Sequence, residues 1–150
     1  MKKIRNVKSR DLKTLLKLEK QVFGSDAFSK EQLQEFLFNH EFFLKMCKGR
    51  FKNKIIGFII TIKDRKDRMN IVNFLVATRY QMKGNGTLLL DKAINLIKDL
   101  KEIKKIILCV KIENQKAINL YKRFSFHIVR KIERYYSSGD DAYLMEKILY

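Results

Sequence analysis

The sequence predicts an α/β (α+β) fold in which helices flank a mixed β-sheet. Short stretches rich in apolar and β-branched residues alternate with stretches whose apolar residues recur every three or four positions, which are the spacings of strands and helices. One strand-like stretch, residues 106–112, is almost entirely apolar, as expected of a strand buried on both faces. No linker rich in Pro, Gly or Ser and no repeat divides the chain, so we expect residues 1–150 to form a single domain.

The first part of the chain predicts a short strand followed by two helices. Residues 3–7 suit the strand, and Ser9 is placed to cap a helix that ends at Gly24. The apolar residues of this helix recur at helical spacing: Leu12, Leu15, Leu16, Leu18, Val22 and Phe23. Residues 29–32 carry a Ser-x-x-Gln capping box, which begins a second helix with Leu33, Phe36 and Leu37 on its apolar face.

The middle of the chain predicts three strands and a long helix. Residues 42–47 and 55–62 have the composition of strands joined by a turn at residues 49–54, and residues 71–76 form a third strand. A glycine-containing turn over residues 78–86 leads into an amphipathic helix. The expected inner side of this helix consists of Leu88, Leu89, Ala93, Leu96, Ile97 and Leu100.

The last part adds a buried strand, a helix and two closing strands. The strand at residues 106–112 precedes a helix over residues 115–124, which brings Ala117, Leu120, Tyr121 and Phe124 to one face. Residues 126–132 and 142–149 are predicted as strands around a turn at residues 137–140. The complete order is βααβββαβαββ.

Composition narrows the class of protein. Hydrophobic residues make up 46% of the chain, which supplies a core and excludes a wholly disordered protein. The longest apolar run, residues 55–62, is far shorter than the roughly 20 residues that cross a membrane. The basic amino terminus is not followed by the apolar stretch of a secretory signal. We therefore expect a cytoplasmic protein without a membrane partner.

The chain is strongly basic, with 33 Lys and Arg residues against 16 Asp and Glu residues and a formal net charge of +17. This balance favours anionic partners such as nucleic acid, a phosphorylated cofactor or the ribosome surface. The basic residues are dispersed, so a solvated lysine-rich surface explains them equally well. Cys47, Cys109, His40 and His127 show no metal-ligand spacing, and we expect reduced thiols and no metal site.

The sharpest local motif is Gln-x-x-Gly-x-Gly at residues 81–86, between a predicted strand and a predicted helix. Glycines let the backbone approach an anion, and the first N–H groups of a helix attract phosphate. A dinucleotide-binding fingerprint is excluded because Leu89 stands where the third glycine belongs. A Walker motif is excluded because no Gly-Lys-Ser/Thr follows the first glycine.

This motif resembles the acetyl-CoA pyrophosphate loop of the GNAT acetyltransferase superfamily. A second GNAT-like signature covers residues 110–126, with Asn114, Ala117 and Tyr121 in the family spacing and Ser125 where the family has glycine. Residues 135–145, with paired tyrosines and an Asp-Ala…Met ending, resemble the RimI-type protein N-terminal acetyltransferases. Residues 23–29 fall where that branch has its substrate-facing loop.

The resemblance implies acetyl-CoA as co-substrate and a set of residues that bind it. The expected cofactor-binding residues are Phe74, Leu75, Val76, Gln81, Met82, Lys83, Gly84, Asn85, Gly86, Thr87, Asn114 and Tyr121. A backbone N–H at residues 74–76 would polarise the thioester carbonyl, and Tyr121 would protonate the departing thiolate. Without the surrounding motif, the helical spacing of Tyr121 favours core packing, and Asn114 suits an ordinary helix cap.

The catalytic base does not carry over from the family, because Cys109 stands at the position of the RimI-type glutamate. A water chain ending at Asp26 or Glu31, or the Tyr135–Tyr136 pair, is the alternative, and we include Asp26 and Glu31 among the candidate catalytic residues. Asp26 also suits a solvated loop, and Glu31 a favourable first-turn charge. Phe28, Tyr135 and Tyr136 are the expected substrate-binding residues, with core packing and a hairpin aromatic pair as their ordinary alternatives.

We therefore expect direct transfer of an acetyl group from acetyl-CoA to the N-terminal α-amine of a protein or peptide within a ternary complex. One alternative keeps the fold and acetylates a small amine or a lysine side chain. Another is a non-catalytic basic protein that binds nucleic acid or the ribosome, for which the net charge of +17 is the argument. Ribosome association is also compatible with catalysis.

Overall fold

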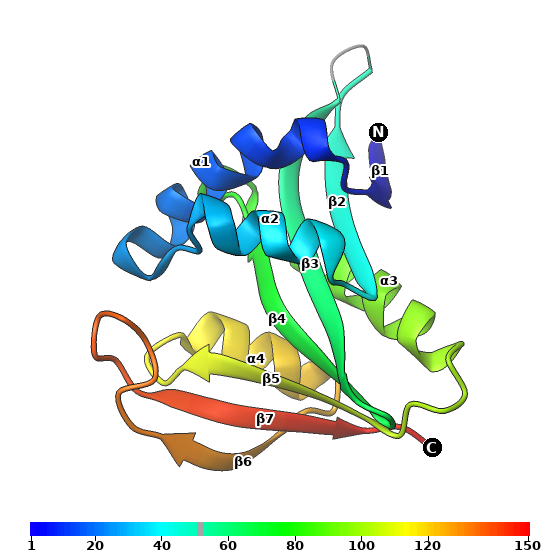
Figure 1. The fold of residues 1–150 in the computed structure, drawn as a ribbon, viewed down its shortest axis with the longest axis vertical. Coiled ribbons are helices and arrows are strands. Elements are labelled where there is room, and N and C mark those ends of the chain that lie inside the picture. Colours follow the sequence, from blue (N-terminus) through cyan, green and yellow to red (C-terminus); the bar gives the residue numbers. More distant parts are fainter. Residues whose placement is uncertain (51–52) are drawn as a thin grey trace.

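The computed structural model describes residues 1–50 and 53–150 and contains one seven-stranded sheet with helices on both faces (Figure 1). The strands are β1 (Lys2–Asn6), β2 (Phe42–Lys48), β3 (Lys54–Arg65), β4 (Arg68–Val76), β5 (Lys105–Lys111), β6 (His127–Ile132) and β7 (Ala142–Ile148). The helices are α1 (Leu12–Phe23), α2 (Lys30–Phe38), α3 (Asn85–Lys98) and α4 (Gln115–Arg123), with short 3-10 turns η1 (Ser9–Asp11), η2 (Gly24–Asp26) and η3 (Thr78–Tyr80). The predicted fold class and element order are confirmed.

The sheet is mixed, with the strand order β1-β2-β3-β4-β5-β7-β6. Every neighbouring pair is antiparallel except β4 and β5, which are parallel. The β4–β5 pairing runs only from Arg68–Lys105 to Ile71–Leu108, although both strands continue beyond these residues. Figure 1 shows the consequence: β4 and β5 start side by side and then diverge, which opens the sheet at its centre.

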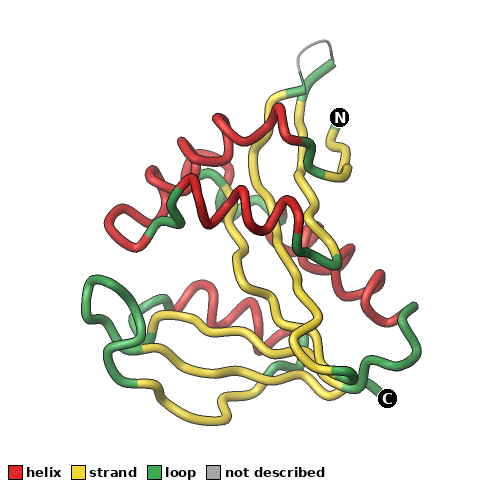
Figure 2. Tube along the Cα trace, in the orientation of Figure 1, coloured by secondary structure: helices red, strands yellow, loops and turns green. Residues whose placement is uncertain are grey.

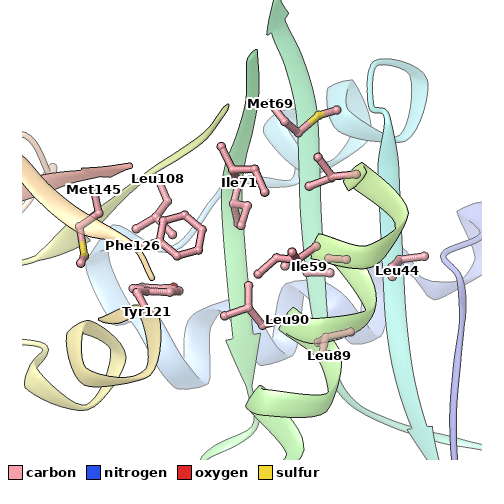
Figure 3. Close-up of a cluster of buried hydrophobic side chains, with 14 of the residues drawn as sticks. Leu44, Ile59, Met69, Ile71, Leu89, Leu90, Leu108, Tyr121, Phe126 and Met145 are labelled. Atoms are coloured by element: carbon pink, nitrogen blue, oxygen red, sulfur yellow. The ribbon is translucent and has the colours of Figure 1, made fainter. Parts of the chain in front are cut away.

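Two hydrophobic clusters hold the layers together. The larger cluster packs α3 and α4 on one face of the sheet, and its members include Leu89, Leu90, Ile118, Tyr121 and Phe126 (Figure 3). The smaller cluster packs α1 and α2 on the other face, around Leu15, Leu33, Phe43, Phe58 and Leu75. The opening between β4 and β5 is therefore bordered by both helical layers.

The starts of the first two helices differ in how well the sequence predicted them. Ser9 does not cap α1: residues 9–11 form the turn η1, and the Asp11 carboxylate accepts the Lys8 backbone N–H at 2.8 Å. Ser29 does cap α2, because its hydroxyl accepts the Gln32 N–H at 3.1 Å and the Gln32 side chain accepts the Ser29 N–H at 2.8 Å. The capping box is thus confirmed, and the cap of α1 lies two residues later than predicted, at Asp11.

The inner face of α3 is rotated from the predicted one. Leu88 is half exposed, whereas Leu90 and Ile94 are buried beside Leu89 and Ala93. Successive helical residues are about 100° apart, so a face centred between Leu89 and Leu90 turns Leu88 toward solvent. Leu96 and Leu100 pack at the margin of the cluster, as partly buried residues.

Strand ends extend beyond the apolar runs. β3 continues to Arg65 and β4 begins at Arg68, because a polar hairpin end still pairs and is joined by an Arg68 Nε–Asp64 Oδ1 ion pair of 2.9 Å. The predicted turn at 49–54 lies partly outside the described residues, and its last residue, Lys54, already belongs to β3. Within the described part of the chain, no helix has the length and apolar character needed to cross a membrane.

Candidate functional site

The divergence of β4 and β5 creates a cavity of about 700 Å³. Thirteen of the predicted site residues line it: Asp26, Phe28, Phe74, Leu75, Val76, Gln81, Met82, Gly84, Gly86, Thr87, Asn114, Tyr121 and Tyr136. Glu31, Lys83, Asn85 and Tyr135 are not among the lining residues. Six separate segments of the chain thus meet in one cavity, which has the size of an ordinary small-molecule site.

One end of the cavity is formed by the amino terminus of α3. Gly84 precedes the helix with a φ of 81°, in the left-handed region that favours glycine, and no side chain caps the first helical N–H groups. Gln81 Nε2 donates to the Val76 carbonyl at 2.8 Å, and Asn85 Nδ2 donates to the Tyr80 carbonyl at 2.8 Å. These bonds hold the loop in place with its backbone N–H groups free for an anion, the arrangement found at phosphate sites.

The wall between the two ends is the last part of β4. Phe74, Leu75 and Val76 pair with β3 on one side, but their other side has lost β5 as a neighbour. Gly57 allows this part of β4 to approach closely, since a Cβ there would lie 2.7 Å from the Leu75 carbonyl oxygen. Backbone groups of an unpaired strand edge are available to a ligand.

Tyr121 combines both interpretations of its sequence motif. It belongs to the larger hydrophobic cluster, with ring centroids 6.2 Å from Phe74 and 5.8 Å from Phe126, and it also lines the cavity (Figure 3). Burial raises the pKa of its hydroxyl, which therefore stays protonated at neutral pH and can act as a donor. Asn114 likewise caps α4, through its Oδ1 and the Ala117 N–H at 3.2 Å, and lines the cavity.

The other end of the cavity is closed by a cross-link between two loops. The Asp26 carboxylate forms an ion pair with Lys111 and accepts hydrogen bonds from the Ser138 N–H at 2.9 Å and hydroxyl at 3.0 Å. Lys111 also pairs with Asp140 at 3.2 Å and lies 5.3 Å from the centre of the Tyr136 ring. The bond to Lys111 lowers the pKa of Asp26, so this carboxylate stays ionised and is a weak proton acceptor.

The tyrosine pair lies beside this cross-link. Tyr135 and Tyr136 pack edge to face with centroids 4.9 Å apart, and only Tyr136 lines the cavity. Burial raises the pKa of Tyr135 to about 12 and also raises the pKa of Cys109, so both groups are protonated at neutral pH. Glu31 lies on the exposed first turn of α2 and does not line the cavity.

Sequence reasoning missed a buried polar pair in the cavity wall. Glu19 of α1 is 1% exposed; its Oε2 accepts the Phe28 backbone N–H at 2.8 Å and its Oε1 accepts from the Asn73 side chain of β4. Both residues line the cavity. A signal was present, because Glu19 stands four positions after the buried Leu15 and Asn73 interrupts the apolar run 71–76. Among the described residues, no three His, Cys, Asp or Glu side chains cluster as a metal site would require.

Comparison with known proteins identifies the family. Residues 10–126 match the Acetyltransferase (GNAT) family. The chain belongs to the GNAT acetyltransferase family. This family match covers the α3 loop, the diverging strands and α4, and it confirms the resemblance seen in the sequence.

Individual GNAT relatives match over almost the whole chain. The N-alpha-acetyltransferase of Sulfurisphaera tokodaii is 27% identical over 157 residues, which cover 95% of this chain and 90% of that protein. The structure of Ard1 from Thermoplasma volcanium has a TM-score of 0.89 at 23% identity, covering 99% of this chain and 98% of that one. Arabidopsis thaliana NAA60 in complex with acetyl-CoA has a TM-score of 0.86 at 19% identity, covering 99% and 100%. The two structural likenesses show that this chain has a GNAT fold.

Proposed function

We propose that this GNAT protein transfers the acetyl group of acetyl-CoA to the N-terminal α-amine of a protein or peptide. The observation that carries the proposal is a single cavity that joins an uncapped helix terminus to the loop pair around Asp26 and Tyr136. Such a cavity has room for acetyl-CoA at the helix terminus and for an acceptor at the loop pair. The similarity to an N-alpha-acetyltransferase over 95% of this chain supports the choice of acceptor.

The residues of the cavity fit acetyl-CoA, which supplies the activated acetyl thioester. The backbone of residues 81–87 would hold the pyrophosphate, because its glycine conformation and uncapped N–H groups suit an anion. Lys116 and Arg123 add positive charge to the cavity wall. Asn114 and residues 74–76 would hold the pantetheine arm, the former through its side chain and the latter through the unpaired edge of β4.

Two groups would assist the transfer itself. A backbone N–H of residues 74–76 would stabilise negative charge on the thioester oxygen as the amine attacks. Tyr121 would give its proton to the sulfur as the carbon–sulfur bond breaks, for which its raised pKa keeps the hydroxyl protonated. Phe28, Tyr135 and Tyr136 would shape the acceptor end, where Asp26 and Lys111 fix the two loops.

We place this reaction in the cytoplasm and assign it to residues 1–150 as one catalytic domain. Protein N-termini emerge at the ribosome, and the net charge of +17 favours association with its anionic surface.

Mass spectrometry of acetylated products tests the proposal. The protein is incubated with acetyl-CoA and short peptides that differ in their first residue and carry an internal lysine, with spermidine as a small-amine control. We expect the acetyl group on the α-amine, and a loss of about 10²–10⁴-fold in rate for Tyr121→Phe. Acetyl on lysine or spermidine instead would overturn the choice of acceptor. No transfer, together with no rise in Tm on adding acetyl-CoA, would overturn the enzymatic function.

A further inference from the structure

Of the carboxylates that line the cavity, Glu19 is the one that is buried without a cationic partner. Three carboxylates line the cavity: Glu19, Asp26 and Glu113. Asp26 is paired with Lys111, and Glu113 is exposed to solvent. The two oxygens of Glu19 accept hydrogen bonds only from neutral groups, the Phe28 N–H and the Asn73 amide. Within the described residues, none of the ion pairs shorter than 4.0 Å involves Glu19.

A buried carboxylate without a cation is unfavourable in the absence of a ligand. The cavity wall at Glu19 is therefore suited to a positively charged ligand group. The α-amine of a peptide is such a group, because its pKa of about 7.7–8.0 leaves most of it as ammonium near pH 7. The phosphates of acetyl-CoA are anionic and do not supply the positive charge that Glu19 would attract.

The position of Glu19 places it on the acceptor side of the cavity. It extends from α1, which packs on the face of the sheet opposite to α3 and α4. Its partner Asn73 lies on the part of β4 that no longer pairs with β5, directly before residues 74–76. Its other partner, Phe28, belongs to the loop that Asp26 fixes to Ser138. Glu19 thus connects the acceptor loop with the point on β4 where the acetyl group is expected.

We infer that Glu19 accepts the proton of the substrate α-ammonium group and thereby generates the amine that attacks acetyl-CoA. The inference rests on the proposed function and names the base that the sequence left open. Asn73 and the Phe28 N–H are positioning groups, which hold the carboxylate toward the cavity.

One N–H proton passes from the ammonium group to the Glu19 carboxylate and later to solvent. The freed nitrogen lone pair forms the bond to the acetyl carbon, and the carbon–sulfur bond breaks with its electron pair on sulfur. Tyr121 protonates that sulfur and recovers a proton from the newly acylated nitrogen. The products are the acetylated amine, the CoA thiol and one released proton.

The surroundings of Glu19 favour such a role near neutral pH. Burial raises the pKa of Glu19, while the bonds from Phe28 and Asn73 oppose the shift. The titratable groups that line the cavity with it are Asp26, Cys109, Lys111, Glu113, Lys116, Tyr121, Arg123 and Tyr136. Lys111 is already engaged by two carboxylates. The charged groups of the neighbouring helix α2, namely Lys30, Glu31 and Glu35, are exposed.

The dependence of kcat/KM on pH tests this role, measured with one acceptor peptide between about pH 5.5 and 9. If Glu19 is the base, the wild-type protein uses the ammonium form, and its acid limb should follow the protonation of Glu19 and lie at lower pH than the titration of the peptide amine. Glu19→Gln depends on the amine that is already neutral, so its acid limb moves up to about 7.7–8.0. At pH 6.5 the variant should retain roughly one twenty-fifth of its own alkaline plateau, since only that fraction of the amine is neutral.

A matched control and a second variant separate this role from a structural one. Glu113→Gln removes another cavity carboxylate and should leave the acid limb in place. Asn73→Ala removes a hydrogen bond that lowers the pKa of Glu19, so its acid limb should move to higher pH. Gln at position 19 can still accept the Phe28 N–H, and a turned Asn73 amide can accept from it. Unfolding curves and the Tm rise with acetyl-CoA check that each variant is folded and binds the co-substrate.

A further substrate sharpens the test. A peptide whose terminal amine is electron-poor enough to be neutral at pH 6.5 should restore Glu19→Gln toward the wild-type rate at that pH. A uniform loss across all pH values, with no rescue, would mean that Glu19 is only structural and would overturn the inference. A wild-type protein that acetylates no α-amine at all would instead overturn the proposed function and this role with it.

Discussion

Asp26, in the turn after α1, forms an ion pair with Lys111, the last residue of β5. The same carboxylate accepts two hydrogen bonds from Ser138, which lies 112 positions later in the chain. In Figure 2 the segment after α1 and the loop between β6 and β7 lie one above the other at the left of the molecule. This cross-link holds together the segments at the end of the cavity that we propose binds the acceptor.

Removing the charge of Asp26 should weaken peptide binding more than acetyl-CoA binding. Asp26→Asn keeps an acceptor for Ser138 but loses the ion pair with Lys111, so the two loops separate more easily. We expect a several-fold higher KM for the peptide and an unchanged KM for acetyl-CoA, measured by steady-state kinetics. Equal changes in both constants would contradict the assignment of this cross-link to the acceptor end.

The same variant has a predictable pH dependence of stability. The lowered pKa of Asp26 means that its ionised form is stabilised in the folded protein. The contribution of Asp26 to the free energy of unfolding is therefore complete above its ordinary pKa of 3.8. It is lost as the pH falls through the lower pKa of the folded state. Urea unfolding of wild type and Asp26→Asn should differ at pH 6 and converge in strong acid. A difference that persists in strong acid would contradict the role of this carboxylate.

Gly57→Ala should disturb β4 beside the proposed thioester site. The added Cβ would lie 2.7 Å from the Leu75 carbonyl oxygen, a distance that the backbone must relieve by moving. Overpacking of this kind lowers the free energy of unfolding by about 1–3 kcal/mol. We expect this loss in urea unfolding, and a fall in kcat because residues 74–76 are displaced. A variant with wild-type stability and kcat would show that β4 tolerates the shift.

Gly84 and Gly86 offer a matched pair in the loop that we propose binds the pyrophosphate. Gly84→Ala forces a side chain into the left-handed region at a φ of 81°, which should lower the free energy of unfolding by about 1–2 kcal/mol. For a chain of this size that lowers Tm by roughly 2–8 °C. Gly86→Ala meets only ordinary contacts, at 3.5 Å from Leu120 and Phe74, and should keep its Tm. Both should bind acetyl-CoA more weakly by calorimetry, and full affinity in both would argue against this loop as the pyrophosphate site.

A buried ion pair away from the cavity should affect stability without affecting catalysis. Lys45 Nζ lies 2.7 Å from Asp11 Oδ2, and both side chains are about nine-tenths buried. Lys45→Met leaves the Asp11 charge without its partner and should destabilise the protein by about 3–5 kcal/mol. Adding Asp11→Asn should recover most of that loss in thermal unfolding. A double variant no more stable than Lys45→Met would show that packing, not charge, is what Lys45 supplies.

Local patterns in the sequence determined most of the fold. Three of these patterns each span only a few residues: the capping box at Ser29, the apolar strand β5 and the helical spacing around Tyr121. They can therefore be recognised from the sequence alone. The same holds for the glycines before α3, because backbone conformation there depends on residue type. The order of these elements and their motifs indicated the GNAT family.

Tertiary structure decided which side chains meet in the cavity. Glu19 and Asn73 are 54 positions apart, and nothing in their spacing indicates that a carboxylate on α1 reaches an amide on β4. Lys111 ends β5 and Asp26 follows α1, so their ion pair depends on how the helix and the sheet are placed relative to each other. Whether Leu88 or Leu90 faces the core depended on the rotation of α3 against the sheet. Periodicity specifies which residues share a face, whereas the packing of whole layers determines what that face contacts.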